Sequence, residues 1–151
     1  MTTYFMDTSA LAKRYLPLEI GAKWVKRETS VASKNRIVIS ELTLAEMTSL
    51  LMRNQRQNTL TSADVQRILR GFSKHVRTAY ALVNLDARRI QQARQLLSIH
   101  SLKTLDTIQL ACAIEFRRLR RKTITFVSAD TRLLTVASLE GFQVDNPLLH
   151  P

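Results

Sequence analysis

The sequence predicts an α/β fold, in which helices cover both faces of a mostly parallel sheet of about five strands. Short apolar runs alternate along the chain with longer helical patterns, and this alternation is typical of β-α-β units. The apolar runs are continuous, as expected of parallel strands that are buried on both faces. The chain has 151 residues and no Pro-, Gly- or Ser-rich linker, so we expect one domain, residues 1–151.

Strands are expected where apolar, β-branched and aromatic residues cluster. The clear runs are Tyr4–Met6, Arg36–Ile39 and Thr123–Val127, and weaker candidates are Ala79–Asn84 and Phe142–Val144. Each run is short, which fits the length of strands in a doubly covered sheet.

Helices are expected in the segments between these strands. Thr43–Arg56 carries leucines and a methionine at helical spacing, and Thr61 followed by Asp64 has the spacing of a capping box. The full set is Thr8–Tyr15, Gly21–Ser30, Thr43–Arg56, Thr61–His75, Asp86–Ile99, Leu105–Arg120 and Asp130–Leu139.

The charge is strongly positive, with 23 Lys and Arg against 12 Asp and Glu, for a net charge of +11. Such an excess on a small domain indicates an anionic partner, and nucleic acid is the first candidate. An acidic protein or a membrane surface are the alternatives. The densest basic run is Arg117, Arg118, Arg120, Arg121 and Lys122, which is also what the solvated C-terminal end of a helix looks like.

Several classes of protein and of site are excluded. No stretch approaches the length of a membrane-spanning helix, the N-terminus does not have the pattern of a signal peptide, and a single cysteine, Cys112, excludes an internal disulfide. A cytoplasmic protein is therefore expected. Glycine-rich phosphate loops and the G-x-S-x-G motif are absent, the histidines are scattered, and Ser9 stands where an aspartyl-phosphate phosphatase needs a second acid.

Four acids fall just after predicted strands or early in predicted helices. Asp7 follows the first strand, Glu46 lies in the helix after the second, Asp106 opens a long helix, and Asp130 follows the Thr123–Val127 strand. In a parallel sheet, strand ends and helix N-termini gather at one edge, where ligands bind. We therefore expect all four carboxylates near that edge.

Each acid also has a purely structural interpretation. Acids are favoured in the first turn of helices, and Thr43 and Glu46 have capping-box spacing. Thr104 and Ser128 are candidate caps for the helices that begin beside them. As a group, however, closely placed carboxylates repel one another, and a divalent cation would relieve that repulsion. Oxygen ligands without Cys or His suit Mg²⁺ or Mn²⁺.

Five short motifs occur in order along the chain. They are Asp7-Thr8-Ser9-Ala10-Leu11, Ser40-x-Leu42-x-x-Ala45-Glu46, Leu105-Asp106-Thr107-Ile108-Gln109-Leu110-Ala111, Val127-Ser128-Ala129-Asp130-x-Arg132-Leu133 and Gly141-Phe142-x-Val144-x-Asn146-Pro147. Together they resemble the motifs of the PIN-domain family, and the VapC-type toxins of type II toxin–antitoxin (VapBC) systems are the group they resemble most. Thr107 departs from the pattern, which usually has a smaller residue there. The polar segment 55–75 could extend a helical hairpin that grips a partner.

The resemblance implies a Mg²⁺- or Mn²⁺-dependent endoribonuclease with a PIN-like (Rossmann-like) α/β/α sandwich. By position, Asp7, Glu46, Asp106 and Asp130 would hold the metal, and Ser128 would support them through a hydrogen bond to a carboxylate. The implied partners are RNA, a VapB-type antitoxin whose C-terminal part covers the active-site groove, and a second copy of the chain in a homodimer.

The expected mechanism is in-line attack of a metal-activated hydroxide on an RNA phosphodiester. Lys13, Arg14 and Arg132 are candidate phosphate contacts because they lie near the acids in sequence, and they are equally well explained as exposed surface charges. Two other functions stay open: a PIN nuclease that processes or degrades RNA without an antitoxin, and a non-catalytic nucleic-acid-binding module.

Overall fold

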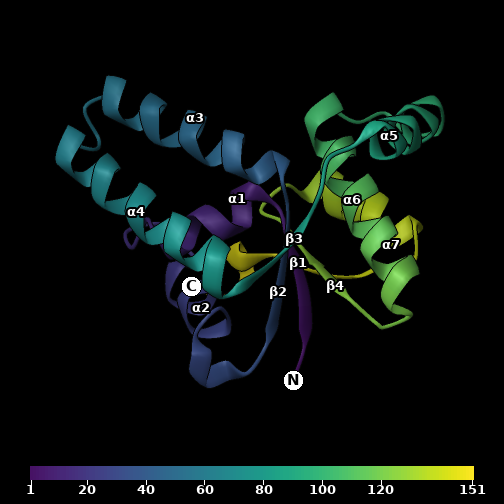
Figure 1. Cartoon of the computed structure of the whole chain (residues 1–151), viewed down its shortest axis with the longest axis horizontal. Helices are drawn as coiled ribbons and strands as arrows, with labels where there is room; N and C mark the ends of the chain where they lie inside the picture. The colour runs from purple at the N-terminus through teal and green to yellow at the C-terminus, as the bar shows by residue number, and fades with distance from the viewer.

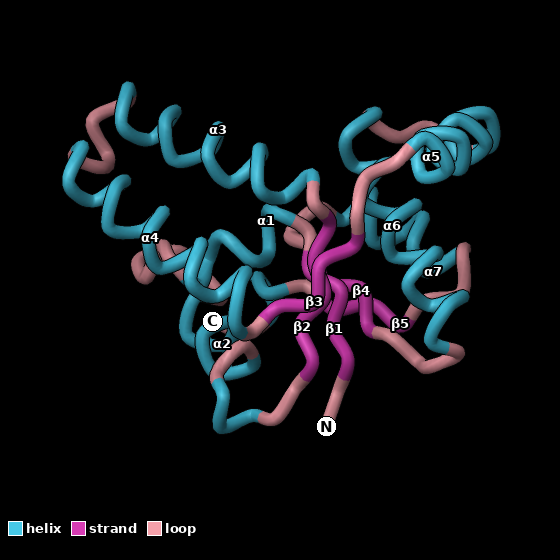
Figure 2. Tube along the Cα trace, viewed as in Figure 1, coloured by secondary structure: helices cyan, strands magenta, loops and turns pink.

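The computed structural model describes residues 1–151. Its centre is a five-stranded sheet in which every neighbouring pair of strands is parallel, in the order β3-β2-β1-β4-β5 (Figures 1 and 2). The strands are β1 (Thr3–Met6), β2 (Arg36–Ser40), β3 (Tyr80–Val83), β4 (Thr125–Val127) and β5 (Gln143–Asp145). The predicted α/β class with a parallel sheet is confirmed.

The helices form two layers, one on each face of the sheet (Figure 1). Helices α1 to α4 lie on one face and α5 to α7 on the other. Their bounds are α1 (Thr8–Leu11), α2 (Ala22–Glu28), α3 (Leu42–Arg56), α4 (Ser62–Thr78), α5 (Ala87–Ile99), α6 (Thr104–Arg120) and α7 (Thr131–Leu139), with 3-10 turns at Ala12–Arg14, Val31–Ser33 and Pro147–Leu149.

The order of the strands creates a crevice at one place on the sheet. From β1 the chain moves outward through β2 and β3, then returns to the other side of β1 to form β4 and β5. The connections leaving β1 and β4 therefore diverge, and ligands bind at such a switch point, outside the carboxyl ends of the strands. Met6 and Val127 are partners in the register of β1 and β4, so the residues that follow them begin side by side.

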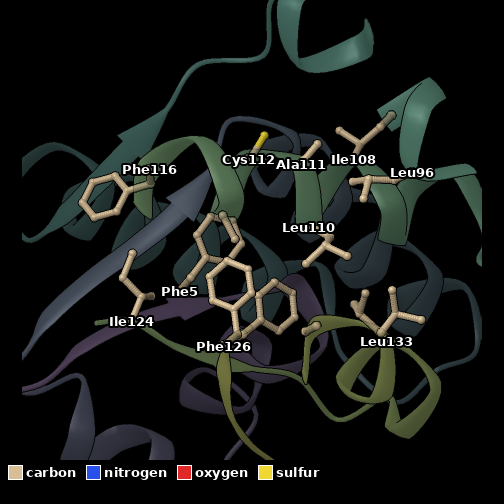
Figure 3. Close-up of a cluster of buried hydrophobic side chains, with 14 of the residues drawn as sticks. Phe5, Leu96, Ile108, Leu110, Ala111, Cys112, Phe116, Ile124, Phe126 and Leu133 are labelled. Carbon is tan, nitrogen blue, oxygen red and sulfur yellow. The ribbon is translucent and has the colours of Figure 1, made fainter. Parts of the chain in front are cut away.

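Alternate residues of the central strand fill the two separate cores. Phe5 packs into the layer of α5 to α7, where its ring stacks on Phe126 at 5.5 Å between centroids (Figure 3). Met6, the next residue, is buried against α1 to α4. Cys112 is buried in the first of these cores, as expected of a lone cysteine in an apolar run. Both faces of β1 are covered, which explains its continuous apolar sequence.

Most expected elements are present, with different ends. The strand expected at Thr123–Val127 begins at Thr125, and the helix expected at Thr8–Tyr15 divides into α1 and a 3-10 turn. The capping box of Thr61 and Asp64 is present at the start of α4. Helices α3 and α4 form a hairpin that projects beyond the sheet (Figure 1). No helix is both long and apolar enough to cross a membrane.

Two residues of the basic run at the end of α6 make polar contacts within the chain. Arg117 lies over the ring of Phe142, 4.0 Å from its centroid, and donates to the carbonyl oxygen of Glu140. Arg118 pairs with the buried Glu115 at 2.8 Å. Arg117 therefore joins α6 to the segment after α7, and Arg118 pairs within α6 itself.

Candidate active site

Three of the four predicted acids line one pocket at the carboxyl edge of the sheet. The pocket has a volume of about 180 Å³ and contains Asp7, Glu46 and Asp106. Its other lining residues are Thr8, Ser9, Leu50, Arg53 and Gln109. A second hollow of about 650 Å³ shares Glu46, Arg53 and Asp106 with it. The acids therefore lie at the inner end of a larger polar groove.

Asp7 is buried and holds the start of α1. Its Oδ1 accepts hydrogen bonds from the Ala10 backbone N–H at 2.9 Å and the Ser9 hydroxyl at 2.8 Å, and its Oδ2 accepts from the Ser128 hydroxyl at 2.6 Å. Burial raises the pKa of Asp7 to about 6, although these hydrogen bonds act in the opposite direction. Ionising this carboxylate is costly without a further positive group.

Ser128 joins the end of β4 to the end of β1. Besides donating to Asp7, its oxygen accepts from the backbone N–H of Asp130 at 3.0 Å. The hydrogen bond to a carboxylate that was expected of Ser128 is therefore present. The alternative interpretation, in which Ser128 caps the next helix, is wrong, because the N-cap of α7 is Asp130.

Glu46 is held by side chains from two other helices. Its Oε1 accepts from the Thr8 hydroxyl at 2.9 Å and from Nε2 of Gln109 at 2.7 Å. The capping-box interpretation of Glu46 is wrong, because α3 has Glu41 as its N-cap and makes no side-chain cap. Thr43 is instead fully buried, and its hydroxyl oxygen accepts from the Gln109 amide at 3.0 Å.

Asp106 lies in the first turn of α6 and is less buried than Asp7. Partial burial raises its pKa, and so do the nearby charges of Asp130 and Glu46, while Lys103 lowers it. The expected cap by Thr104 is absent, since the N-cap is Lys103 without a side-chain bond. Mutual repulsion of carboxylates is the property that a bound cation would relieve.

Asp130 lies at the margin of this cluster. Its Oδ1 accepts from the backbone N–H groups of Arg132 at 2.9 Å and Leu133 at 3.2 Å, so it caps α7. It does not line the pocket of the other three acids, yet it is close enough for its charge to raise the pKa of Asp106. The capping interpretation thus holds for one of its two oxygens.

The cations at this site differ from those expected. Lys13 is buried and pairs with Glu19 at 2.9 Å, and Arg14 donates to Thr29. Both line a different pocket, which shares no lining residue with the pocket of the acids. Their nearness to the acids in sequence therefore does not bring them into the acidic pocket, whereas Arg132 is exposed beside Asp130.

Sequence reasoning missed Arg53 and Lys103, which line the groove together with the acids. A helical signal was available for both, because Arg53 lies seven residues after Glu46 and Lys103 three before Asp106, and such spacings place residues on one helix face. Sequence reasoning also missed Gln109, although its spacing of three residues from Asp106 places both on one face of the helix.

The donor set agrees with a hard divalent cation, because the pocket offers carboxylate and hydroxyl oxygens and no Cys or His. As the side chains stand, no group of three Asp, Glu, His or Cys residues is placed to hold one ion. Mg²⁺ is commonly bound through one or two carboxylates with water completing its shell. The residues present therefore fit a largely hydrated Mg²⁺ or Mn²⁺ ion.

Known structures share this fold over almost the whole chain. VapC20 of Mycobacterium tuberculosis, a sarcin-ricin-loop-cleaving toxin, is 21% identical with a TM-score of 0.64, over 92% of this chain and 95% of that one. VapBC2 from Rickettsia felis, bound to a promoter DNA fragment, is 15% identical with a TM-score of 0.65, over 96% and 98%. A toxin–antitoxin complex from Klebsiella pneumoniae is 17% identical with a TM-score of 0.59, over 95% and 97%.

At these identities the likeness concerns the fold. No curated protein matches the sequence. The sequence profile of the PIN domain, however, matches residues 4–139, which include all four acids, Ser128 and strands β2 to β4. The chain therefore belongs to the PIN-domain family.

Proposed function

We propose that this PIN domain is a metal-dependent endoribonuclease and the toxin of a VapBC-type toxin–antitoxin pair. The observation that carries the proposal is the meeting of Asp7, Glu46 and Asp106 in one pocket at the switch point of the sheet. Membership of the PIN-domain family supports it. So does the fold shared with VapC20 and with two toxin–antitoxin complexes.

We assign the metal to Asp7, Glu46 and Asp106, with Asp130 as a fourth, outer carboxylate. A bound Mg²⁺ or Mn²⁺ would lower the pKa of a coordinated water and offset charge on the phosphate. The chain's own residues keep the carboxylates in place: Ser128 orients Asp7, and Gln109 orients Glu46.

Arg53 and Lys103 complete the proposed site as phosphate contacts. Both line the groove that leads to the acids, and the phosphodiester oxygens of RNA are the anions expected there. The positive charge of Arg53 and Lys103 also attracts the RNA backbone to a pocket that is otherwise acidic. The scissile phosphate would thus lie between these cations and the acids.

The proposed protein partners are a VapB-type antitoxin and a second copy of the chain. Structures similar to this one include toxin–antitoxin complexes from Rickettsia felis and Klebsiella pneumoniae. Co-purification with the product of a short neighbouring reading frame, and inhibition of cleavage by that product, tests the antitoxin. Light scattering tests the homodimer. Active nuclease without any such partner would instead favour RNA processing or decay.

The central test is cleavage of total RNA by the purified chain in Mg²⁺, in Mn²⁺ and in EDTA. We expect discrete products with either metal, none in EDTA and none with Asp7→Asn. Asp64→Asn is the matched control, because Asp64 is an exposed acid of α4, and it should cut as the natural chain does. Metal-dependent cleavage that survives Asp7→Asn would disprove the assignment of the site.

A non-catalytic binding module gives a different pattern. It would bind RNA without cutting it and would show no binding of Mg²⁺ that Asp7→Asn or Glu46→Gln removes. Titration of Mg²⁺, followed by calorimetry with the natural chain and both variants, separates that outcome from the nuclease.

A further inference from the structure

A third pocket, separate from the two hollows that contain the acids, lies between α2, α4 and the turn after α1. It has a volume of about 580 Å³, within the usual range for small-ligand sites. Six of its lining residues are basic: Lys13, Arg14, Lys23, Lys26, Arg67 and His75. No acid lines it, and it shares no lining residue with the groove of Asp7 and Glu46.

The basic residues of this pocket divide into two groups. Lys13 and Arg14 are fixed by contacts with Glu19 and Thr29, and they form the inner wall. Lys23 and Lys26 are exposed on α2 and have no ion-pair partner within the chain, and Arg67 of α4 pairs only with the exposed Asp64 at 3.3 Å. The outer charges are therefore free to meet an anion from solution.

The surroundings of His75 show that positive charge gathers at the pocket. Burial lowers its pKa, and the positive charges of Arg14 and Lys74 lower it further. Its Nδ1 hydrogen-bonds the hydroxyl of Tyr15 at 2.8 Å, and that hydroxyl reaches Tyr80 at 2.8 Å. These hydrogen bonds join the wall of the pocket to β3, and Arg14 and Lys74 place positive charge beside it.

Gly71 provides an independent observation. It lies in the middle of α4 and lines the pocket, and a Cβ added there would meet nothing within 4 Å. Glycine is unfavourable within a helix compared with alanine, and here neither packing nor a positive φ requires it. The missing side chain leaves bare helix backbone facing the pocket, where a bulky ligand can approach closely.

We propose that this pocket binds backbone phosphates of RNA outside the cleavage site. The inference rests on the proposed function for the identity of the anion, since RNA is the polyanion that a ribonuclease must hold. Six basic side chains and no acid line the pocket, and this one-sided charge favours an anionic ligand. Exposed lysines on flexible stems are typical of contacts to a nucleic-acid backbone.

The test compares two double variants, each of which removes two positive charges. The binding of a labelled oligouridylate is measured in EDTA, where metal-dependent cutting is absent. Lys23→Gln/Lys26→Gln removes the exposed lysines of the pocket. Arg88→Gln/Arg94→Gln removes the same charge from α5, across the sheet. For single strands, each lost phosphate contact lowers the slope of log K against log salt by about 0.7. We expect a fall of about 1.4 for the first pair and little change for the second.

Gly71→Ala gives a second, opposite signature. The substitution should raise the midpoint of thermal unfolding, because alanine favours the helix, yet weaken binding of the oligouridylate several-fold. A higher midpoint of thermal unfolding together with weaker binding of the oligouridylate cannot come from damage to the protein. Unchanged RNA affinity in this variant would count against the pocket.

The remaining outcomes are decisive as well. Equal salt slopes for the lysine pair and the arginine pair would overturn the proposal, because RNA would then respond to the overall charge of the protein and not to this pocket. Binding of polyglutamate that Lys23→Gln/Lys26→Gln abolishes, with an unchanged RNA slope, would overturn it in favour of an acidic peptide. Because RNA binding is measured without metal, failure of the pocket is distinct from failure of the nuclease, which the Asp7→Asn cleavage assay decides.

Discussion

Asp7 illustrates, at the scale of one residue, how a site can work against the stability of its own fold. Three donors hold the carboxylate in place, while burial opposes its ionisation and raises its pKa to about 6. An aspartate that only capped α1 would gain nothing from such complete burial. The same position is useful if a bound cation offsets the cost of ionising the buried carboxylate.

The pKa of Asp7 sets a pH dependence of stability. Its folded value of about 6 lies above the ordinary 3.8, so its contribution to stability is fully present below pH 3.8 and is lost as the pH rises through about 6. Without metal, the loss amounts to about 3 kcal/mol. Asp7→Asn should therefore be more stable than the natural chain at about pH 8 in EDTA, with no such gain at about pH 4.

Guanidinium unfolding at the two pH values measures this difference. Ser128→Ala is a useful companion, because it removes the shortest hydrogen bond to Asp7 and leaves the charge. A lower stability of Asp7→Asn at both pH values would show that its hydrogen bonds outweigh its desolvation.

Gln109 is the second residue whose role is testable alone. It is buried, and its amide donates to Glu46 and Thr43. Gln109→Met keeps the size but removes these bonds, so we expect a loss of about 1–3 kcal/mol in the free energy of unfolding and weaker binding of Mg²⁺. Gln66→Met on the exposed face of α4 is the control. Unaltered Mg²⁺ affinity would make Gln109 purely structural.

At the scale of elements, the contact between α5 and α6 depends on a buried ion pair. Glu115 of α6 is 2% exposed and pairs with Arg89 of α5 at 2.9 Å and with Arg118 at 2.8 Å. The hydrogen bonds from Arg118, and then the charge of Arg89, lower its pKa to about 2. Its contribution is therefore present above its ordinary pKa of 4.5 and lost as the pH falls through about 2.

Removing the charge of Glu115 leaves the buried Arg89 with only the exposed Asp86, 3.5 Å away, as a counter-ion. Glu115→Gln should cost about 3 kcal/mol in the free energy of unfolding at neutral pH. It should also flatten the acid side of the stability profile. Denaturant unfolding between about pH 2 and pH 7 tests both points. Glu140→Gln, which removes the partner of His100, serves as the comparison, and an equal effect would contradict the special role of the buried pair.

At the scale of the whole molecule, the C-terminal segment closes one side of the fold. His150 stacks on Trp24 with ring centroids 4.4 Å apart and bonds Asp145 at 2.8 Å. Gly21 makes this approach possible: its φ is +84°, and a Cβ there would lie 2.3 Å from the carbonyl oxygen of Pro147. The first turn of α2 and the end of the chain therefore depend on one missing side chain.

Gly21→Ala should disturb this closure. The left-handed conformation alone costs an alanine about 1–2 kcal/mol, and the clash with Pro147 adds to it. Trp24 is the only tryptophan, so its fluorescence should change as the stacked His150 moves away. Thermal unfolding and fluorescence together measure the effect. A natural-like spectrum with unchanged stability would show that the backbone adjusts without cost.

Local patterns in the sequence determined the class of fold and the place of the acids. Apolar runs such as Tyr4–Met6 and helical periodicities such as Thr43–Arg56 depend on neighbouring residues alone, so the order of elements could be read directly. The parallel sheet then required the residues after β1 and β4 to share an edge. This was sufficient to predict that Asp7, Glu46 and Asp106 lie close together.

Only the tertiary structure decided what each side chain does there. Gln109 and Thr8, both bonded to Glu46, are 101 residues apart in sequence, and Lys13 is buried by elements that its neighbours do not indicate. Hydrogen bonds, burial and pKa shifts depend on which distant segments pack together, and residue spacing along one element carries no such information. For that reason the separation of Lys13 and Arg14 from the acids, and the hydrogen bonds of Thr8 and Gln109 to Glu46, required the folded chain.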